Sequence, residues 1–178
     1  MIYLYQSNRG GNDMKYQEYM DILKQRMVDC FDVEQDKAVG DYVFPLVATY
    51  HVENINYFLS VEIEIYGADN NIVHCVVKDH NPTIDSVSQL IEILKEERSN
   101  LIPQSKNHMS SSLCLLIVTE QAVDEGLRRF VEKFKYRWSS FLGIKGWVDF
   151  GVSIFQLSDG KWITNKESKT HEKFFIIN

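Results

Sequence analysis

Cysteine, proline and glycine are scarce in this chain, and each shortage excludes a class of protein. The 178 residues include 3 Cys, 3 Pro and 9 Gly. So few Pro and Gly argue against a disordered or low-complexity chain. The three cysteines, Cys30, Cys75 and Cys114, are widely spaced, which fits reduced thiols in the cytoplasm better than a disulfide framework. We therefore expect a folded cytoplasmic protein.

Long apolar runs are also lacking, which excludes a membrane-spanning helix and a secretory signal. No run approaches the roughly 20 apolar residues that a helix needs to cross a bilayer. The N-terminus has no basic start followed by an apolar segment, as a secretory signal would. We expect no membrane partner. A chain of 178 residues is long enough for one domain with its own core.

Positive charge is sparse in the first 125 residues. That part holds 9 Lys and Arg against 20 Asp and Glu, whereas residues 126–178 hold 10 against 5. The acidic part argues against general binding of polyanions. The basic part leaves room for an anionic ligand or a nucleic acid, although solvated faces of surface helices would give the same charges.

The first thirteen residues differ from the rest of the chain. Helical periodicity begins sharply at Met14, and the codons for the residues just before it could form a ribosome-binding-like stretch. We interpret residues 1–13 as a non-native or disordered leader, with a short natural arm as the alternative. Residues 14–178 are then a single globular domain.

Hydrophobic periodicity and turn residues predict the elements of this domain. Residues 53–56 and 67–71 are rich in Asn, Gly and Asp, which favour tight turns, so the first three strands form an antiparallel meander. The order α-βββ-α-β-α-ββ predicts an α+β (mixed α/β) fold, with the meander extended into a mixed sheet and helices packed on it. The predicted elements are helices at 14–31, 84–102 and 121–137 and strands at about 42–53, 57–66, 72–78, 112–119, 148–157 and 161–164.

The first six predicted elements match the core order of the restriction-endonuclease-like nuclease fold. In that superfamily carboxylates on neighbouring strands hold Mg²⁺, and a lysine helps to activate water. Lys78 ends the third predicted strand, Glu62 and Glu64 lie on the second, and Glu18 on the first helix could add a carboxylate. Val76 occupies the position where the superfamily has an acid. Lys78 as a solvent-facing strand end is the simpler interpretation.

Other catalytic and metal-binding patterns are missing. His74 and Cys75 are neighbours, so they point to opposite faces of an ideal strand and offer no pair of ligands. The sequence has no P-loop, no G-x-G-x-x-G and no G-x-S-x-G. We expect no metal and no cofactor, except Mg²⁺ if the nuclease-like alternative holds. The sequence patterns together argue against an enzyme.

Basic and aromatic residues alternate in KFKYRWSSFLGIKGWVDF, residues 133–150. Basic groups meet phosphates and aromatic rings stack on bases, so the stretch could bind single-stranded nucleic acid. Phe134, Trp138 and Phe141 also share one face at helical spacing, which is typical of core packing.

Four short stretches resemble an uncharacterised prokaryotic family, a domain of unknown function: YHVENINYF, HMSSSLCLLIVTE, FLGIKGWVDF and ITNKESK, which begin at residues 50, 108, 141 and 163. The resemblance covers about residues 15–174, and Glu167-Ser168 replaces an expected basic-Gly pair. It implies no activity, but it highlights polar and aromatic residues at strand ends and loops, where sites are common. The candidate ligand-binding residues are His51, His108, Lys145, Trp147, Asp149, Asn165 and Lys166.

The sequence favours a binding module for an anionic ligand or a protein partner, carried by the basic C-terminal part. One alternative is a divergent or inactive metal-dependent nuclease-like enzyme, which requires Glu62, Glu64 and Lys78 to converge. Another is a homo-oligomeric structural protein, for example a homodimer through edge strands or the FFII tail. The binding module instead requires Lys145, Lys166 and Trp147 to be exposed on one basic face.

Overall fold

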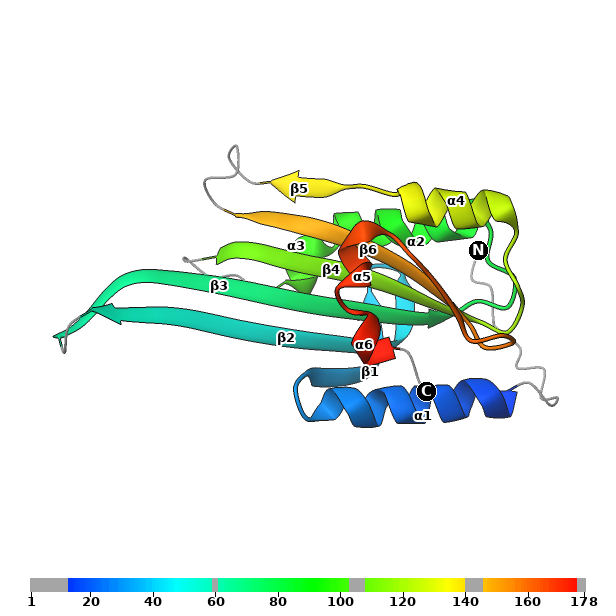
Figure 1. The fold of residues 1–178 in the computed structure, drawn as a ribbon, viewed down its shortest axis with the longest axis horizontal. Coiled ribbons are helices and arrows are strands. Elements are labelled where there is room, and N and C mark those ends of the chain that lie inside the picture. The colour runs from blue at the N-terminus through cyan, green and yellow to red at the C-terminus, as the bar shows by residue number, and fades with distance from the viewer. Residues whose placement is uncertain (1–12, 59–60, 103–107, 140–145, 176–178) are drawn as a thin grey trace.

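The structure is a computed structural model that describes residues 13–58, 61–102, 108–139 and 146–175 (Figure 1). The proposed leader therefore lies almost wholly outside the described residues. The elements are α1 (Asp13–Val28), β1 (Asp32–Val39), β2 (Tyr42–Phe58), β3 (Val61–Lys78), α2 (Ile84–Glu96), α3 (Arg98–Leu101), β4 (His108–Thr119), α4 (Glu125–Lys133), β5 (Arg137–Ser139), β6 (Trp147–Gln156), β7 (Lys161–Thr164), α5 (Lys166–Lys169) and α6 (Glu172–Phe175).

The seven strands form one mixed sheet in the order β1-β2-β3-β4-β6-β5, and β7 also pairs with β6. β1, β2 and β3 are an antiparallel meander. β3, β4 and β6 run parallel to one another, while β5 and β7 run antiparallel to β6. The structure therefore confirms the α+β class and the meander extended into a mixed sheet.

Helices cover both faces of this sheet, and the described residues form an apolar cluster on each face. On one face, α2 and α4 bury residues such as Val87 and Leu127 against the central strands. On the other, α1 buries Leu23 and Met27, and the chain end adds Phe175. In Figure 1, α5 and α6 cross the near face of the sheet, and α1 lies below it. No helix among the described residues has the length and apolar character that crossing a bilayer requires.

Local sequence explains why α2 begins where it does. Thr83 accepts a hydrogen bond from the backbone N–H of Ser86, whose hydroxyl in turn accepts from the Thr83 N–H, a reciprocal capping box. The predicted apolar stripe of this helix is buried, although Ile84 at its start is 42% exposed. The single helix expected at 84–102 is in fact two, because α2 ends at Glu96 and the short α3 follows.

The first strand of the meander was missed by sequence reasoning. β1 is mostly exposed and rich in charge, so it lacks the apolar alternation that identifies a strand. Its register is constant from Asp32 to Val39, with Gln35 opposite Leu46 and Lys37 opposite Phe44, so Asp36 falls at the level of Pro45. Asp36 has φ 49°, and Pro45 across from it has no N–H to donate. Pro45 is therefore tolerated inside β2 and does not start it.

The two turns predicted inside the meander are wrong. Residues 53–56 and 67–71 are not turns but pair with one another, with Asn54 opposite Ala68 and Ile55 opposite Gly67. Turn propensity is a local preference, and a continuous partner strand satisfies the same backbone groups better. We call residues 50–58 and 61–68 the β2–β3 arm. It extends well beyond the other strands (Figure 1).

The predicted helix at 121–137 is shorter than expected. α4 ends at Lys133, and Arg137–Ser139 form the edge strand β5. Phe134 and Trp138 are therefore not a helical stripe, but both are partly buried against the apolar cluster under α2 and α4. The core interpretation of these two rings holds, while Phe141 lies outside the described residues.

Candidate functional site

The residues of the nuclease-like hypothesis are not brought together. Glu62, Glu64 and Lys78 were expected on two neighbouring strands, but all three lie on β3. Glu64 precedes Lys78 by fourteen residues, and at ~3.3 Å per residue the two are roughly 45 Å apart along the strand. Glu18, on α1, is exposed. The constellation that would hold Mg²⁺ beside the lysine is therefore not formed.

Lys78 instead belongs to a cluster at the carboxyl ends of the parallel strands. Its Nζ lies 4.0 Å from Oε1 of Glu120, and His80 Nδ1 lies 3.6 Å from the other carboxylate oxygen. The Lys78 Nζ also lies 4.6 Å from the ring centroid of Tyr16 on α1. The side chains of Lys78 and Glu120 are only 15% and 10% exposed, so Lys78 is not the solvent-facing strand end that we expected.

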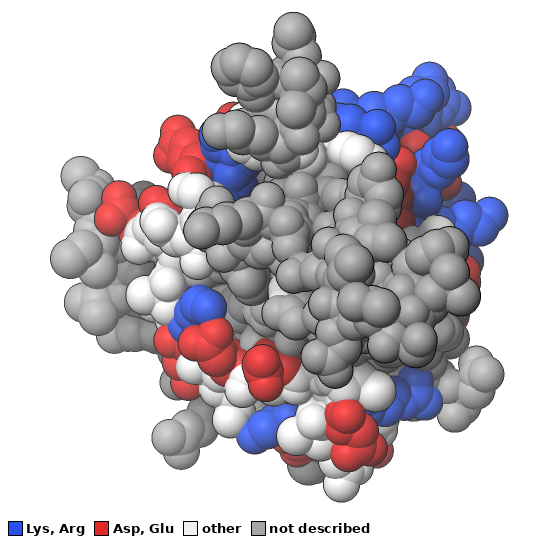
Figure 2. Space-filling view, turned by 90° about the vertical axis from the view of Figure 1, so that its left-hand side faces the viewer, with Lys and Arg blue, Asp and Glu red and all other residues white. Residues whose placement is uncertain are grey.

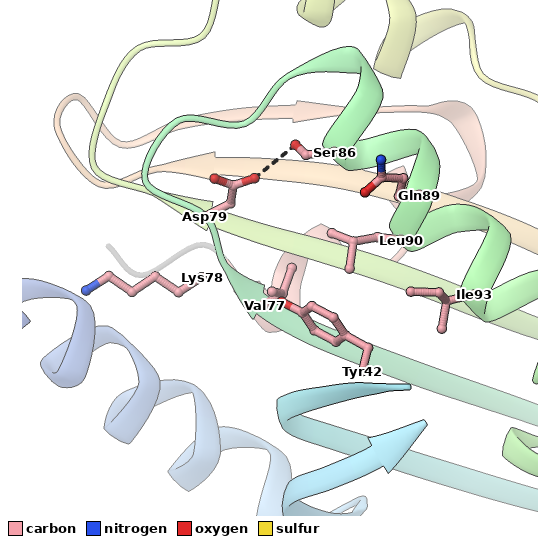
Figure 3. A pocket seen from close by; sticks show the side chains of 8 residues that line it. All are labelled: Tyr42, Val77, Lys78, Asp79, Ser86, Gln89, Leu90 and Ile93. Carbon is pink, nitrogen blue, oxygen red and sulfur yellow. Dashed lines mark hydrogen bonds between the residues drawn. The ribbon is translucent and has the colours of Figure 1, made fainter. Parts of the chain in front are cut away.

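The pocket beside this cluster offers little room for a ligand. It has a volume of about 220 Å³, below the range of typical small-molecule sites. Figure 3 shows Lys78 pointing away from the pocket toward α1, while Asp79 faces Ser86. The Asp79 carboxylate accepts from the Ser86 hydroxyl at 3.0 Å and from the Asn81 N–H at 3.0 Å. The cluster thus ties α1 and α2 to the end of the sheet.

Three of the four sequence motifs meet at the opposite end of the parallel strands. His51 of the first motif lies opposite Asn71 on β3, and Asn71 lies opposite Ser111 of the second motif. Ser111 lies opposite Val148 of the third motif, and Ser110 lies opposite Trp147. Segments far apart in the sequence therefore share two adjacent rows of the sheet.

A buried polar chain runs across the first of these rows. The Nδ1 of His51 lies 2.5 Å from Oδ1 of Asn71, and the Asn71 amide donates to the Ser111 hydroxyl at 3.2 Å. Asn71 and Ser111 are 1% and 3% exposed, whereas His51 is exposed. Because the Asn71 amide separates the imidazole from the hydroxyl, His51 cannot take the proton of Ser111 directly. The chain is therefore not a nucleophile–base pair.

The other face of the same strands carries aromatic, aliphatic and charged groups in one row. Ser112 lies opposite Ile72 on one side and Asp149 on the other, Tyr50 extends the row past Ile72, and Arg137 extends it past Asp149. Trp147 lies on the same face because it is two residues from Asp149 on β6. We call these six residues the motif surface. Arg137 is exposed and the other five are half-buried.

Arg137 and Asp149 form the main charged contact of the motif surface. Nε of Arg137 donates to Oδ1 of Asp149 at 2.5 Å, and Nη2 donates to Oδ2 at 2.8 Å, a bidentate pair. The hydrogen bonds to Asp149 raise the pKa of Arg137 further, so the guanidinium stays charged. The guanidinium carbon lies 5.4 Å from the ring centroid of Trp147. The pair therefore fixes the arginine beside the indole.

The basic face that we expected is described only in part. Lys166 is exposed on α5, but Lys145 and the side chain of His108 lie outside the described residues. Figure 2 shows Lys and Arg gathered at the upper right of the end that faces the viewer, whereas both signs of charge mix along its lower edge. On the motif surface itself Arg137 is compensated by Asp149.

Asn165, a candidate ligand-binding residue, has a structural role. It is 2% exposed and caps α5, and its Oδ1 accepts from the N–H groups of Val152 at 3.0 Å and Ser168 at 3.1 Å. Its amide donates to the carbonyl oxygens of Phe134 at 3.2 Å and Phe150 at 3.0 Å. These bonds join α5 to β6 and to the end of α4, and a ligand would have to break them.

His74 in the middle of β3 is a core residue. It is fully buried, and neither ring nitrogen has a hydrogen-bond partner among the described residues. Rings surround it, with centroids 4.7 Å away for Phe175, 5.0 Å for His171 and 5.5 Å for Phe31. Burial, with a smaller contribution from His171, holds the pKa of His74 well below its ordinary value. The histidine is therefore neutral in the fold.

A comparison with protein families now places the chain. Residues 15–177 match the family described as "Domain of unknown function (DUF8052)". The chain belongs to this family. The match confirms the resemblance seen in the sequence and covers α1 to the end of α6. No curated protein and no solved structure matches the DUF8052 chain, so the nuclease-like similarity gains no support from these comparisons.

Sequence reasoning found part of each cluster. It identified His51, Trp147 and Asp149 through the motifs. Arg137 was included only in the basic and aromatic stretch 133–150, and it was assigned to a helix. Sequence reasoning missed Glu120, although this acid directly follows the apolar strand β4 and Lys78 ends the neighbouring parallel strand. Parallel strands end at one edge, so this pair could have been predicted once the topology was known.

Proposed function

We propose that this DUF8052 protein is a binding module that recognises a protein partner through the motif surface. The observation that supports this most is the presence of Tyr50, Trp147 and Arg137 on one face of the sheet, with the two rings half-buried and the arginine exposed. Tyr, Trp and Arg are the residues that most often carry the binding energy of protein interfaces.

The motif surface is also rigid before it binds. Its residues lie on paired strands, and the two hydrogen bonds to Asp149 hold Arg137 in one position beside Trp147. A side chain that is already ordered loses little rotamer freedom on binding. The partner should therefore present an apolar side chain to the rings and an acceptor for the remaining guanidinium N–H groups.

The Arg137–Asp149 pair favours a polypeptide over a small anion. A phosphate at this point would approach the Asp149 carboxylate as closely as the guanidinium, and the like charges would oppose it. The polar chain on the opposite face and the separation of Glu64 from Lys78 likewise favour binding over catalysis.

We further propose that the protein acts in the cytoplasm. Cys75 and Cys114 are buried free thiols, and Cys30 is an exposed one. An exposed thiol persists best in a reducing compartment.

The experiment is affinity capture from the native host with wild-type protein and the variant Arg137→Ala. Arg129→Ala is the matched control, because Arg129 is also exposed and bound to one carboxylate, that of Glu125 at 2.9 Å, but lies on α4. Captured proteins are identified by quantitative mass spectrometry and purified for direct affinity measurements. Loss of a hot-spot contact worth about 2 kcal/mol weakens binding roughly 30-fold.

The proposal expects one partner whose affinity falls about 30-fold in Arg137→Ala and less than about 3-fold in Arg129→Ala. An equal loss of affinity in both variants, or the absence of a specific partner, would overturn the proposal. Binding of short RNA or DNA that disappears in high salt would instead support the anionic-ligand alternative, because such binding depends on counterion release.

A further inference from the structure

Among the described residues, the β2–β3 arm has a long strand edge that no other strand pairs with. β1 pairs with β2 only as far as Thr49, and β4 pairs with β3 only from Asp69 onward. Within the described ranges, residues 50–58 therefore have β3 as their one strand neighbour, and residues 61–68 have β2. The arm is a two-stranded ribbon that projects from a seven-stranded sheet (Figure 1).

A two-stranded ribbon of this length is marginally stable alone in water. Its nine outer residues span about 30 Å at ~3.3 Å per residue. Proteins usually protect such edges with Pro, Lys or bulges, but residues 50–68 contain no Pro, Lys or Arg. The register irregularities of the arm lie between Asn56 and Phe58, near its tip, so the edge is regular from Tyr50 to Asn56.

We infer that the outer edge of residues 50–58 pairs antiparallel with the same edge of a second copy of this chain. The two arms would then form a continuous four-stranded ribbon about a twofold axis. Such an isologous interface places one segment against itself, so the segment must be compatible with its own reversed sequence. This inference goes beyond the proposed function and rests on the β2–β3 arm, which shares only Tyr50 with the motif surface.

The sequence of the outer edge meets this requirement. With the axis at Asn54, Glu53 faces Ile55 of the other copy, Val52 faces Asn56, and no like charges are opposed. The inner edge of the arm is less suitable. Self-pairing centred on residue 62, 63 or 64 sets Glu62 or Glu64 directly against a glutamate of the other copy.

The first test compares wild type with Asn54→Lys and Ala68→Lys by sedimentation. Asn54 and Ala68 lie opposite each other on the arm, so both variants add one positive charge at the same level of the ribbon. Only Asn54 lies on the edge proposed to pair, where the two lysines would repel across the axis. Wild type and Ala68→Lys should sediment at twice the 20.8 kDa chain mass, and Asn54→Lys at the chain mass.

A second test does not depend on a disruptive variant. In a Cys30→Ser background, Asn54→Cys should form a covalent dimer under mild oxidation, because the two thiols would meet at the axis. Glu92→Cys, on the exposed side of α2, is the control and should stay monomeric.

Three results would overturn the inference. The first is a monomeric wild type at about 100 μM, a concentration far above the micromolar dissociation constant of a weak specific pair. The second is an Asn54→Lys variant that stays dimeric. The third is an equal loss of dimer in the Ala68→Lys variant. These tests read mass rather than capture of a partner, so their failure is distinct from failure of the proposed function.

Discussion

Replacing His74 with leucine should remove most of the acid sensitivity of this fold. His74 is fully buried among rings and has no hydrogen-bond partner among the described residues for its ring nitrogens. The titratable groups that face it are His171 and, across the neighbouring strand, Cys114. Leucine has a similar volume and no polar atom, so it replaces the imidazole with little repacking.

The magnitude follows from the lowered pKa of His74. The folded state keeps the imidazole neutral, whereas the unfolded chain binds a proton below a pKa of 6.5. Stability is therefore fully present above pH 6.5 and is lost as the pH falls below it. One proton corresponds to ~1.36 kcal/mol per pH unit, so wild type should lose up to this amount for each pH unit below 6.5 over which His74 stays neutral in the fold.

Urea unfolding at pH 7.5, 6.5, 5.5 and 4.5 measures this loss for wild type and His74→Leu. At pH 7.5 the two free energies of unfolding should agree within about 1.5 kcal/mol, because the loss of an unsatisfied polar group offsets imperfect packing. Below pH 6.5 the stability of the variant relative to wild type should rise by up to ~1.36 kcal/mol for each pH unit. Parallel pH curves for the two proteins would refute the reasoning.

Three further predictions concern the contacts of α5 and the thiols. Gly151→Ala should cost about 2 kcal/mol in urea unfolding, because its Cβ would lie 2.2 Å from a serine hydroxyl of α5. Asn165→Ala should cost more than about 3 kcal/mol, since four buried hydrogen bonds are lost; a smaller loss would show that α5 is held otherwise. DTNB at pH 8 should label Cys30 alone in the native protein, because Cys75 and Cys114 are buried and burial raises the pKa of Cys114 to about 12; rapid labelling of all three would contradict this.

The fold class followed from the sequence where periodicity is strong. The apolar strand at 112–119 and the stripe of α2 were correctly identified, because burial fixes their residues over a whole element. β1 and the arm were not, because their structure depends on partners rather than on local pattern. Asn54 and Gly67 have turn propensity, yet each is held extended by the strand beside it.

The candidate site was predictable only where a residue type carries its own signal. Trp147 and Asp149 stood out in a short motif, and the register then placed them on the same face of the sheet as Tyr50, ninety-seven residues before Trp147. Asn165 stood out equally, but its four hydrogen bonds give it a structural role that spacing could not reveal. Sequence therefore selected the polar residues, and only the topology divided them into structural and exposed groups.

The measurement that tests the binding surface most directly is photo-crosslinking in the native host. A benzoylphenylalanine replaces Trp147 on the motif surface or, as control, Arg129 on α4. The account predicts a covalent adduct with one other protein from position 147 and no such adduct from position 129. No adduct at 147, the same adducts at both positions, or an adduct of twice the chain mass alone would contradict the assignment of this face to a protein partner.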